Sequence, residues 1–419
     1  MDRMSDAQIN EFDIVIAGAG MVGASLACLL AESSLRIALI DRNPLVQNKD
    51  NESAEIHSDK FDPRVSAISQ ASQQLFQQLG VWEDMKAARV CNYGAMEVWD
   101  AEGTGSIEFS AAEINQPELG NIVENSIIIA ALHKRIAQLE NIFPITPFSI
   151  ESFEHIERQD GSIVKLNAGD GQAIRAPLVI AADGANSKLR QLANFGCREW
   201  DYEQHALVTT VRTQLPHNNT ALQRFMETGP LAFLPLRAAS EDDAQQFCSI
   251  VWSMLPDQAE RAMSLSEDEF NAELAAALES KLGAIEWSDK RFVFPLRQRH
   301  ALNYVKESIV LVGDAAHTIH PLAGQGVNLG LLDAKALAEE LQRGIEAGRS
   351  VADPTVLLRY QRRRKGNNLS MMWLMEGFKR LFAQQNLSIR WLRNIGMNAA
   401  DKMTPIKNQM IRKAMGLDS

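Results

Sequence analysis

Residues 12–41 read FDIVIAGAGMVGASLACLLAESSLRIALID, and this stretch decides the fold of the N-terminal region. Its first six residues are rich in β-branched side chains, which predicts a buried strand. The spacing G-x-G-x-x-G follows at once, and residues 21–32 predict a helix. Residues 36–40 are apolar again after Arg36 and predict the next strand. The stretch is therefore a strand–turn–helix–strand unit of the kind that builds parallel sheets.

The three glycines of this unit have different expected roles. Gly18 makes the tight turn, Gly20 lets the backbone approach a pyrophosphate, and Gly23 lets the helix pack closely on the strand. Met21 and Val22 begin the helix, whose free backbone N–H groups bind phosphate oxygens. The pattern therefore predicts a binding site for the pyrophosphate of a dinucleotide.

Asp41 ends the second strand, where an acidic residue accepts hydrogen bonds from a ribose. This arrangement indicates a dinucleotide cofactor but does not distinguish NAD from FAD. A signal peptide or a transmembrane helix is the competing interpretation of the apolar run 14–31. We disfavour it because the preceding residues carry four acids and one arginine, and because glycines interrupt the run.

Length and composition limit the other possibilities. A chain of 419 residues is too long for a single core, so we expect two domains and an appendage. The net charge of −11 argues against a nucleic-acid-binding protein. The four cysteines lie far apart, so neither a disulfide framework nor a zinc ribbon is expected, and a cytoplasmic location fits.

Two later apolar strands also end in a glycine turn with an acidic residue. Asp183 stands in such a turn within residues 177–190, and Gly313 and Asp314 stand in another within residues 308–341. Each acid follows the carboxyl end of a strand, where α/β sheets bind ligands. Taken singly, Asp183 and Asp314 are equally well explained as turn-forming residues.

Together the three turns resemble the fingerprints of the group A flavoprotein monooxygenases, single-component aromatic hydroxylases with one FAD-binding fold. The matching runs are GAGMVG (18–23), ADGANSKLR (182–190) and VGDAAHTIHPLAGQGVN (312–328). The resemblance covers nearly the whole chain, and the third run is similar to the branch that hydroxylates ubiquinone precursors. Peripheral matches such as MEVWDAEG (96–103) and IRKAMGL (411–417) favour action on ring carbon 5 of 2-octaprenylphenol.

The resemblance implies a mixed α/β fold similar to p-hydroxybenzoate hydroxylase. Such a fold has a Rossmann-type FAD-binding domain, an inserted β-sheet substrate domain and a helical C-terminal tail. The expected segments are 1–75, 120–195 and 299–345 for the FAD-binding domain, 76–119 and 196–298 for the substrate domain, and 346–419 for the basic helical C-terminal region.

The resemblance also implies which residues contact FAD. They are Gly18, Gly20, Met21, Val22 and Gly23 at the pyrophosphate, Asp41 at the adenosine ribose, Arg64 on the flavin side, Gly313 and Asp314 at the ribityl chain, and Gly326, Val327 and Asn328 at the flavin edge. Asp183 belongs to the motif that the resemblance links to both FAD and the passing nicotinamide cofactor. Backbone N–H groups of Val327 and Asn328 would stabilise the anionic edge of reduced flavin. A surface salt bridge is the alternative for Arg64. Several relatives place a glutamine at the flavin where this chain has Ile129, so we expect no contact there.

The implied chemistry uses NAD(P)H, O2 and a flavin C4a-hydroperoxide to hydroxylate a polyprenylphenol. NAD(P)H would bind transiently, because no second strand-borne G-x-G-x-x-G is present. Pro321 is expected to line the reaction chamber, and His320 is a candidate for moving the phenol proton, although a histidine bonded to loop backbone is the simpler interpretation. We expect no metal, since His317 and His320 offer too few ligands. Aromatic residues such as Phe233, Trp252 and Phe294 belong either to the sheet core or to the pocket wall.

The C-terminal region is basic, with twelve Lys and Arg residues against three acids from Tyr360 onward. A helix docked on the main body is the commoner explanation of such a segment. Peripheral contact with anionic lipid, or with a protein complex of ubiquinone biosynthesis, is the alternative. Three hypotheses for function stay open: hydroxylation at carbon 5, a sister enzyme acting at ring carbon 6 or 1, and a non-catalytic flavoprotein scaffold.

Overall fold

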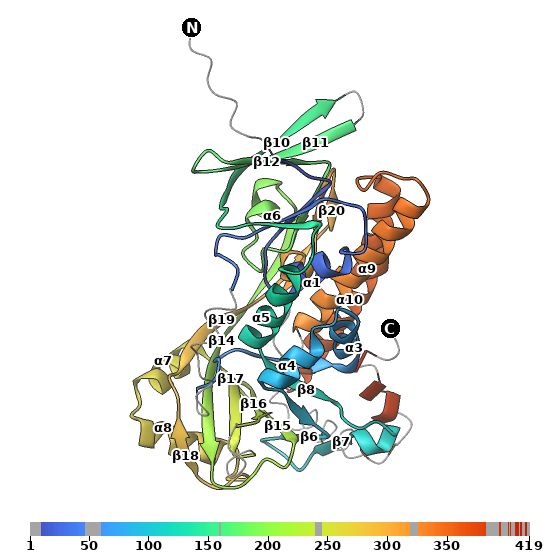
Figure 1. The fold of residues 1–419 in the computed structure, drawn as a ribbon. Helices are drawn as coiled ribbons and strands as arrows, with labels where there is room; N and C mark the ends of the chain where they lie inside the picture. The colour runs from blue at the N-terminus through green and yellow to red at the C-terminus, as the bar shows by residue number, and fades with distance from the viewer. Residues whose placement is uncertain are drawn as a thin grey trace.

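The computed structural model describes residues 10–46, 60–158, 161–238, 245–318, 326–382 and ten single positions between 394 and 416. The described residues form sheets of four, six, nine and three strands. The six-stranded and nine-stranded sheets are the centres of two layers, which occupy the upper and lower halves of Figure 1. Strands from distant parts of the chain are neighbours in both sheets, so the chain passes between the layers several times.

The six-stranded sheet is the core of the first layer. Its order is β20 (Val305–Lys306), β21 (Ile309–Leu311), β13 (Leu178–Ala181), β2 (Ile14–Ala17), β3 (Ile37–Ile40) and β9 (Ile142–Ile145). All neighbours pair in parallel except β20 with β21. The central strands are short runs of buried Ile, Val, Leu and Ala, as expected where helices cover a parallel sheet. The helices packed on it are α1 (Met21–Leu29), α5 (Asn125–Ile136) and α9 (Gly326–Glu346).

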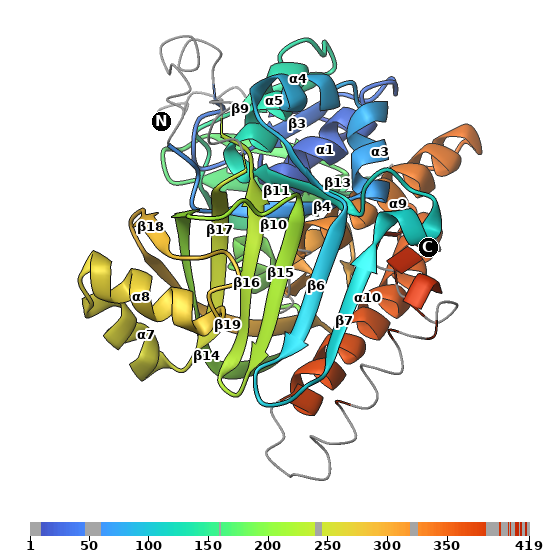
Figure 2. The same cartoon turned by 90° about the horizontal axis from the view of Figure 1, so that it is seen from below.

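The nine-stranded sheet forms the second layer, seen from below in Figure 2. Its order is β22 (His317–Thr318), β19 (Phe292–Ala301), β14 (Cys197–Thr213), β17 (Phe247–Met254), β16 (Gly229–Leu236), β15 (Thr220–Met226), β6 (Ala95–Asp100) and β7 (Ser106–Ser110), with β18 (Ile285–Ser288) also on β14. One face packs Leu207 and Trp252 against Phe270 of α8 (Glu267–Ala277), beside α7 (Pro256–Ser264). The other face is directed at the three-stranded sheet β4 (Val65–Ser69), β8 (Gly120–Glu124) and β5 (Cys91–Tyr93).

Smaller elements complete the described part. They are the sheet of β1 (Asn10–Glu11), β12 (Ala173–Ala176), β11 (Gly161–Ala168) and β10 (Ile150–Arg158), the helices α3 (Gln70–Gln78), α4 (Trp82–Ala88) and α6 (Lys188–Leu192), and the 3₁₀ turns η1 (Ala111–Ile114) and η2 (Gly313–Ala315). Helix α10 (Pro354–Phe382) lies along α9, and both figures show the two side by side.

The mixed α/β fold with a Rossmann-type sheet and an inserted second sheet is the expected one, so this prediction is confirmed. The segment 76–119 is shared between the layers, because β6 and β7 join the nine-stranded sheet while Trp82 and Met85 of α4 pack in the core of the first layer. The apolar run 14–31 forms β2 and α1, as predicted. Within the described ranges, no helix is both long enough and apolar enough to span a membrane.

Candidate functional site

The glycine turn after β2 gives each of its glycines a different environment. Gly18 has a φ of +107°, and a Cβ on it would lie 2.3 Å from the carbonyl oxygen of Ala182. A Cβ on Gly23 would lie 1.9 Å from the carbonyl oxygen of Gly18, because α1 starts against the turn. A Cβ on Gly20 would meet nothing within 4 Å. The first two glycines are therefore needed for packing, whereas Gly20 leaves open space at the N-terminus of α1, where backbone N–H groups are free to bind an anion.

Asp41 and His133 hold this turn from two sides. The Asp41 carboxylate accepts the N–H of Ala19 and the N–H of Asn43, both at 2.8 Å. The Nδ1 atom of buried His133 accepts the N–H of Val46 at 3.1 Å, so its Nε2–H donates to the Ala19 carbonyl oxygen at 2.7 Å. Burial lowers the pKa of His133. A neutral imidazole thus fixes the turn from behind, a role that the sequence did not reveal.

Asp183 follows β13 and faces the start of α6. Its Oδ2 accepts the N–H of Lys188 at 2.7 Å, while its Oδ1 is buried without a hydrogen-bond partner among the described residues. Burial raises the pKa of this carboxyl group, against the effect of its hydrogen bonds. Arg190, in the same helix, donates to the carbonyl oxygens of Ala185 at 2.7 Å and Ala315 at 2.9 Å. Arg190 therefore ties the second glycine turn to the third.

The third turn carries Asp314 directly after β21. Gly313 has a φ of +59°, and a Cβ on it would lie 3.2 Å from Cγ2 of Val22, while a Cβ on Gly330 of α9 would lie 2.7 Å from the same atom. The first and third turns therefore meet at one valine. Asp314 has an exposed surface, yet the protein around it is dense enough that desolvation raises the pKa of its carboxyl group, with His317 acting in the opposite direction. This combination suits a carboxylate that accepts a hydrogen bond from a bound molecule.

The start of α9 is anchored by a side chain. The amide of buried Asn328 accepts the N–H of Ser69 at 3.0 Å and donates to the carbonyl oxygen of Ala67 at 2.8 Å. Its side chain thus joins α9 to β4, in addition to the backbone role that the resemblance implies. The first N–H groups of α9, from Gly326 to Asn328, have no acceptor within the helix. Their predicted contact with the flavin edge stays a prediction.

For Arg64, His320 and Pro321, the remaining predicted site residues, the structure gives fewer contacts or none. The Arg64 side chain is exposed and makes no ion pair with another described residue, while its backbone bonds Asp62 and Asn125. The surface salt bridge considered for Arg64 is therefore not seen. His320 and Pro321 lie outside the described residues, so their predicted roles stay predictions.

Aromatic residues of the nine-stranded sheet divide between its two faces. Phe233 and Trp252 are buried in the core under α7 and α8. Phe294 lies on the opposite face and is 41% exposed, and Phe292 beside it is 39% exposed. Phe294 pairs with Ala206 in the neighbouring strand, and Ala206, Val208 and Leu296 are buried on the same face. Of these aromatic candidates, only Phe294 is placed to line a pocket.

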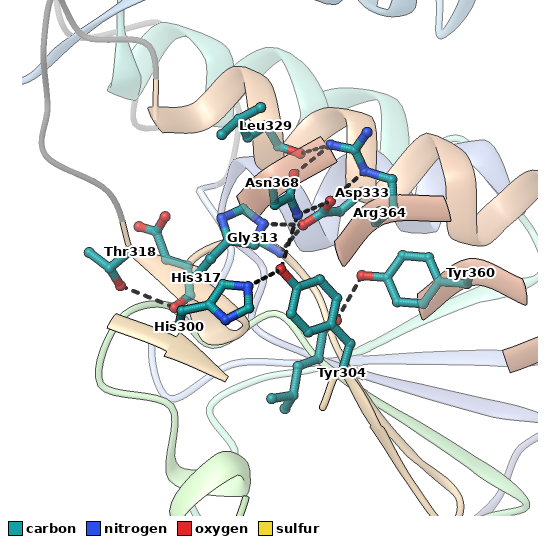
Figure 3. Close-up of polar contacts among 12 residues, drawn as sticks. His300, Tyr304, Gly313, His317, Thr318, Leu329, Asp333, Tyr360, Arg364 and Asn368 are labelled. Carbon is teal, nitrogen blue, oxygen red and sulfur yellow. Dashed lines mark hydrogen bonds and ion pairs between the residues drawn. The ribbon is translucent and has the colours of Figure 1, made fainter. Parts of the chain in front are cut away.

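A buried polar network lies behind the third turn, and Figure 3 shows its members. Its centre is Asp333 of α9, a fully buried carboxylate that accepts hydrogen bonds from the first layer and from α10. His317, considered above as a metal ligand, donates to Asp333 at 2.5 Å. Across the described ranges, no three His, Cys, Asp or Glu side chains are arranged to hold one metal ion.

Comparison with known proteins identifies the family. A model of the FAD binding domain family matches residues 11–371. The 3-demethoxyubiquinol 3-hydroxylase of Escherichia coli is 37% identical over 406 residues, which cover 97% of this chain and 98% of that protein. The ubiquinone hydroxylase UbiL of Rhodospirillum rubrum is 32% identical and covers 96% of this chain and 89% of its own. The COQ6 monooxygenase of Xenopus tropicalis is 31% identical, with 96% and 92% covered.

The chain belongs to the family of FAD-dependent ubiquinone-biosynthesis hydroxylases. Solved structures agree on the fold of this hydroxylase. The p-nitrophenol 4-monooxygenase PnpA of Pseudomonas putida superimposes with a TM-score of 0.75 at 17% identity, over 97% of this chain and 99% of that one. PqsL of Pseudomonas aeruginosa gives a TM-score of 0.73 at 18% identity, over 93% and 100%. The predicted enzyme class and the FAD cofactor are thereby confirmed, whereas the E. coli relative is named for a ring position other than carbon 5.

The observed geometry fits FAD. Open space lies beside Gly20 at a helix N-terminus, and one buried oxygen of Asp183 lacks a partner among the described residues. The sequence did not reveal the residues behind the turns: His133, Arg190, Asp333 and Arg364. Arg190 ends the matching run ADGANSKLR, which was the one available signal. Arg364 belongs to the basic C-terminal region, yet it is buried against Asp333, so this cation is not available to an outside partner.

Proposed function

We propose that this hydroxylase uses NAD(P)H and O2 to hydroxylate ring carbon 5 of 2-octaprenylphenol. The proposal rests on similarity along nearly the full length to hydroxylases of the ubiquinone pathway. The local matches at residues 96–103 and 411–417 favour carbon 5 within this family. The balanced reaction converts the phenol, O2, NAD(P)H and one proton into a catechol, NAD(P)⁺ and water. A phenol oxygen activates its ortho carbons, so ortho hydroxylation is chemically accessible to this substrate.

The residues of the three turns would share the work of holding FAD. Gly20 and the N-terminus of α1 would bind the pyrophosphate, and Asp41 would bind the ribose through the lone pairs that its two backbone bonds leave free. Asp314 would accept a hydrogen bond from the ribityl chain, and the unpartnered oxygen of Asp183 would accept one from FAD or from the passing nicotinamide cofactor. When bound, FAD supplies the transfer of electrons from NAD(P)H to O2.

The ring and tail of the substrate would lie on the sheet face that carries Phe292 and Phe294. These two aromatic rings are exposed while Ala206 and Val208 beside them are buried, so the rings are apolar groups that a hydrophobic ligand could reach. Pro321 would line the chamber and His320 would accept the phenol proton. Contact between the basic helix α10, where Trp373 is 66% exposed, and an anionic membrane would bring the enzyme to such a substrate.

A second candidate comes from one specific comparison. The E. coli relative is named for 3-hydroxylation of a 3-demethoxyubiquinol. The same three turns and the same apolar face would serve that later ring intermediate equally well. The two candidates therefore differ in the substituents that the ring already carries, not in the cofactor chemistry.

Product analysis tests the proposal. The FAD-loaded enzyme is given NAD(P)H, O2 and either a short-chain 2-prenylphenol or a short-chain demethoxyubiquinol, and products are identified by mass spectrometry and ring NMR. A catechol formed at carbon 5 of the prenylphenol is the expected result. Hydroxylation of the demethoxyubiquinol alone would establish the second candidate. An enzyme that binds FAD but shows no stimulation of NAD(P)H oxidation by either substrate would contradict both candidate reactions and favour a non-catalytic scaffold.

A further inference from the structure

Asp333 joins two separate parts of the molecule through its two carboxylate oxygens. Oδ2 accepts the backbone N–H of Gly313 at 3.1 Å and the Nε2–H of His317 at 2.5 Å. Oδ1 accepts the Nε–H of Arg364 at 2.7 Å and an amide N–H of Asn368 at 3.0 Å. One oxygen therefore serves the turn that carries Asp314, and the other serves α10 (Figure 3).

The bonds to the turn bracket the predicted cofactor residue. Gly313 and His317 stand on either side of Asp314, and both are held by the same oxygen. Gly313 has a φ of +59°. Because glycine adopts many backbone conformations, the contacts around Gly313 decide which one it takes. A change in the position of Asp333 would therefore move both ends of the turn at once.

The bonds to α10 come from one face of that helix. Tyr360, Arg364 and Asn368 are spaced by four residues, which places them in one line along the helix. The Tyr360 hydroxyl donates to the carbonyl oxygen of Leu311 at 2.8 Å, in the strand that leads into the turn. Three side chains of α10 therefore reach the strand and turn that present Asp314, two of them through Asp333.

We call the hydrogen bonds of Asp333 with the Asp314 turn and with α10 the Asp333 junction. Its charges make it sensitive to the loss of His317 or Arg364. Asp333 is fully buried, which by itself raises the pKa of its carboxyl group, but His317 and Arg364 outweigh burial and lower that pKa to about 2. The carboxylate is therefore ionised at neutral pH and needs both neighbours. Removing one partner of a buried charged group leaves the other without compensation.

We propose that Asp333 is a positioning residue for the flavin site, through which the docking of α10 sets the conformation of the Asp314 turn and thereby the affinity for FAD. Helix α10 is then a member of the cofactor site without touching the cofactor. The proposal uses the FAD cofactor and is independent of which ring is hydroxylated. Because coupling is reciprocal, FAD binding must in turn stabilise the docked α10.

The test compares three variants with a matched control. Asp333→Asn and Arg364→Met each break the junction, Tyr360→Phe removes a single hydroxyl, and Arg363→Met makes the same change at the adjacent arginine, which is exposed and pairs with Glu339. FAD is titrated into each apo-protein and followed by quenching of flavin fluorescence. We expect affinity about tenfold or more weaker for the first two, since each loses charged hydrogen bonds, and a smaller loss for Tyr360→Phe. Arg363→Met should bind within twofold of wild type.

Hydrogen exchange separates coupling from a merely structural role. In the wild-type protein and in Arg363→Met, FAD should slow amide exchange both in residues 311–318 and in residues 360–368. A structural role alone would lower the melting temperature of the apo-protein and leave the FAD affinity of the folded fraction unchanged. Wild-type FAD affinity in folded Arg364→Met and Tyr360→Phe, or FAD that leaves exchange in residues 360–368 unchanged, would overturn the proposal. If Asp333→Asn does not fold, these two variants and the exchange data decide.

Discussion

The glycine turn at residues 18–23 and the turn at residues 313–317 both follow a buried parallel strand, yet different forces hold them. The first is shaped by close contacts of backbone with backbone, which leave no room for a Cβ on Gly18 or Gly23. The second is held by a buried carboxylate, an arginine and a histidine that come from three separate segments. The first turn depends on small residues within a few positions, and the second on charges brought together by folding.

The difference teaches where each turn is vulnerable. The glycine turn at residues 18–23 is destabilised when a single carbon atom is added, because the packed backbone around it leaves no space for that atom. The turn at residues 313–317 is destabilised when a charged partner is removed or when a buried group changes its protonation, because a buried charge is then left uncompensated. Substitutions and pH should therefore affect the two turns differently.

The largest expected effect is a steric one, on Gly23→Ala. Its Cβ would lie 1.9 Å from a backbone oxygen, so we expect a loss of about 3 kcal/mol or more in the free energy of unfolding. Urea unfolding of the apo-protein measures it. Gly20→Ala is the matched control, since its Cβ meets no protein atom within 4 Å. It should cost no more than about 1 kcal/mol of stability and still weaken FAD binding at least tenfold. Equal stability of the two variants would refute the packing role of Gly23.

Next in size is a pH effect at His300, at the edge of the charged junction. His300 lies 3.0 Å from the Tyr304 hydroxyl, and burial, with His317 adding to it, lowers the pKa of His300 to about 4. Its folded-state pKa is below its ordinary value of 6.5, so its contribution to stability is complete above pH 6.5 and is lost as pH falls towards 4. Relative to His300→Gln, the wild type should lose up to roughly 3 kcal/mol over that range. If the free energies of unfolding of the two proteins change by the same amount between pH 4 and 6.5, the prediction is wrong.

Asp314→Ala should separate cofactor binding from folding. The carboxyl group is exposed and its pKa is raised by the surrounding protein, so its removal should leave the melting temperature of the apo-protein unchanged or slightly higher. Loss of a hydrogen bond to a charged acceptor predicts FAD affinity weaker by about tenfold to a hundredfold. The ratio of flavin to protein absorbance after purification reports the result. Normal FAD content would contradict the assignment.

The smallest expected effect lies in the link between the second and third turns. The hydroxyl of buried Ser187 accepts the N–H of Arg190 at 3.0 Å and caps α6, from which Arg190 reaches the carbonyl oxygen of Ala315. Ser187→Ala should cost about 1 kcal/mol in the free energy of unfolding. FAD affinity should change by less than threefold, because Arg190 keeps its own bonds. A large loss of FAD binding would show that this cap also controls the third turn.

Local signals made the fold and the first turn predictable. The strand, the glycine spacing and the acid at Asp41 all lie within thirty residues, and the contacts they predict form between near neighbours in sequence. The three-turn pattern also predicted that Asp183 and Asp314 follow parallel strands. The roles of His320 and Pro321 stay predictions, since both lie outside the described residues.

The residues that hold the third turn, Asp333 and Arg364, were not predictable from local sequence signals. Arg362, Arg363 and Arg364 are consecutive, and in sequence all three belong equally to the basic C-terminal region. In the structure Arg364 is buried against Asp333, while Arg363 pairs with Glu339 at the surface. The rotational phase of α10 against α9 decides which arginine is buried, and no pattern within the run reveals that phase.

The sequence by itself determined the parallel unit, the positions of the three turns and the family, because backbone conformation and close packing depend on residue size at fixed local spacing. Only the tertiary structure decided that Asp333 serves the Asp314 turn with one oxygen and α10 with the other. The physical reason is that a buried charge acts through three-dimensional distance and desolvation, and its partners here lie 16 to 35 positions away along the chain.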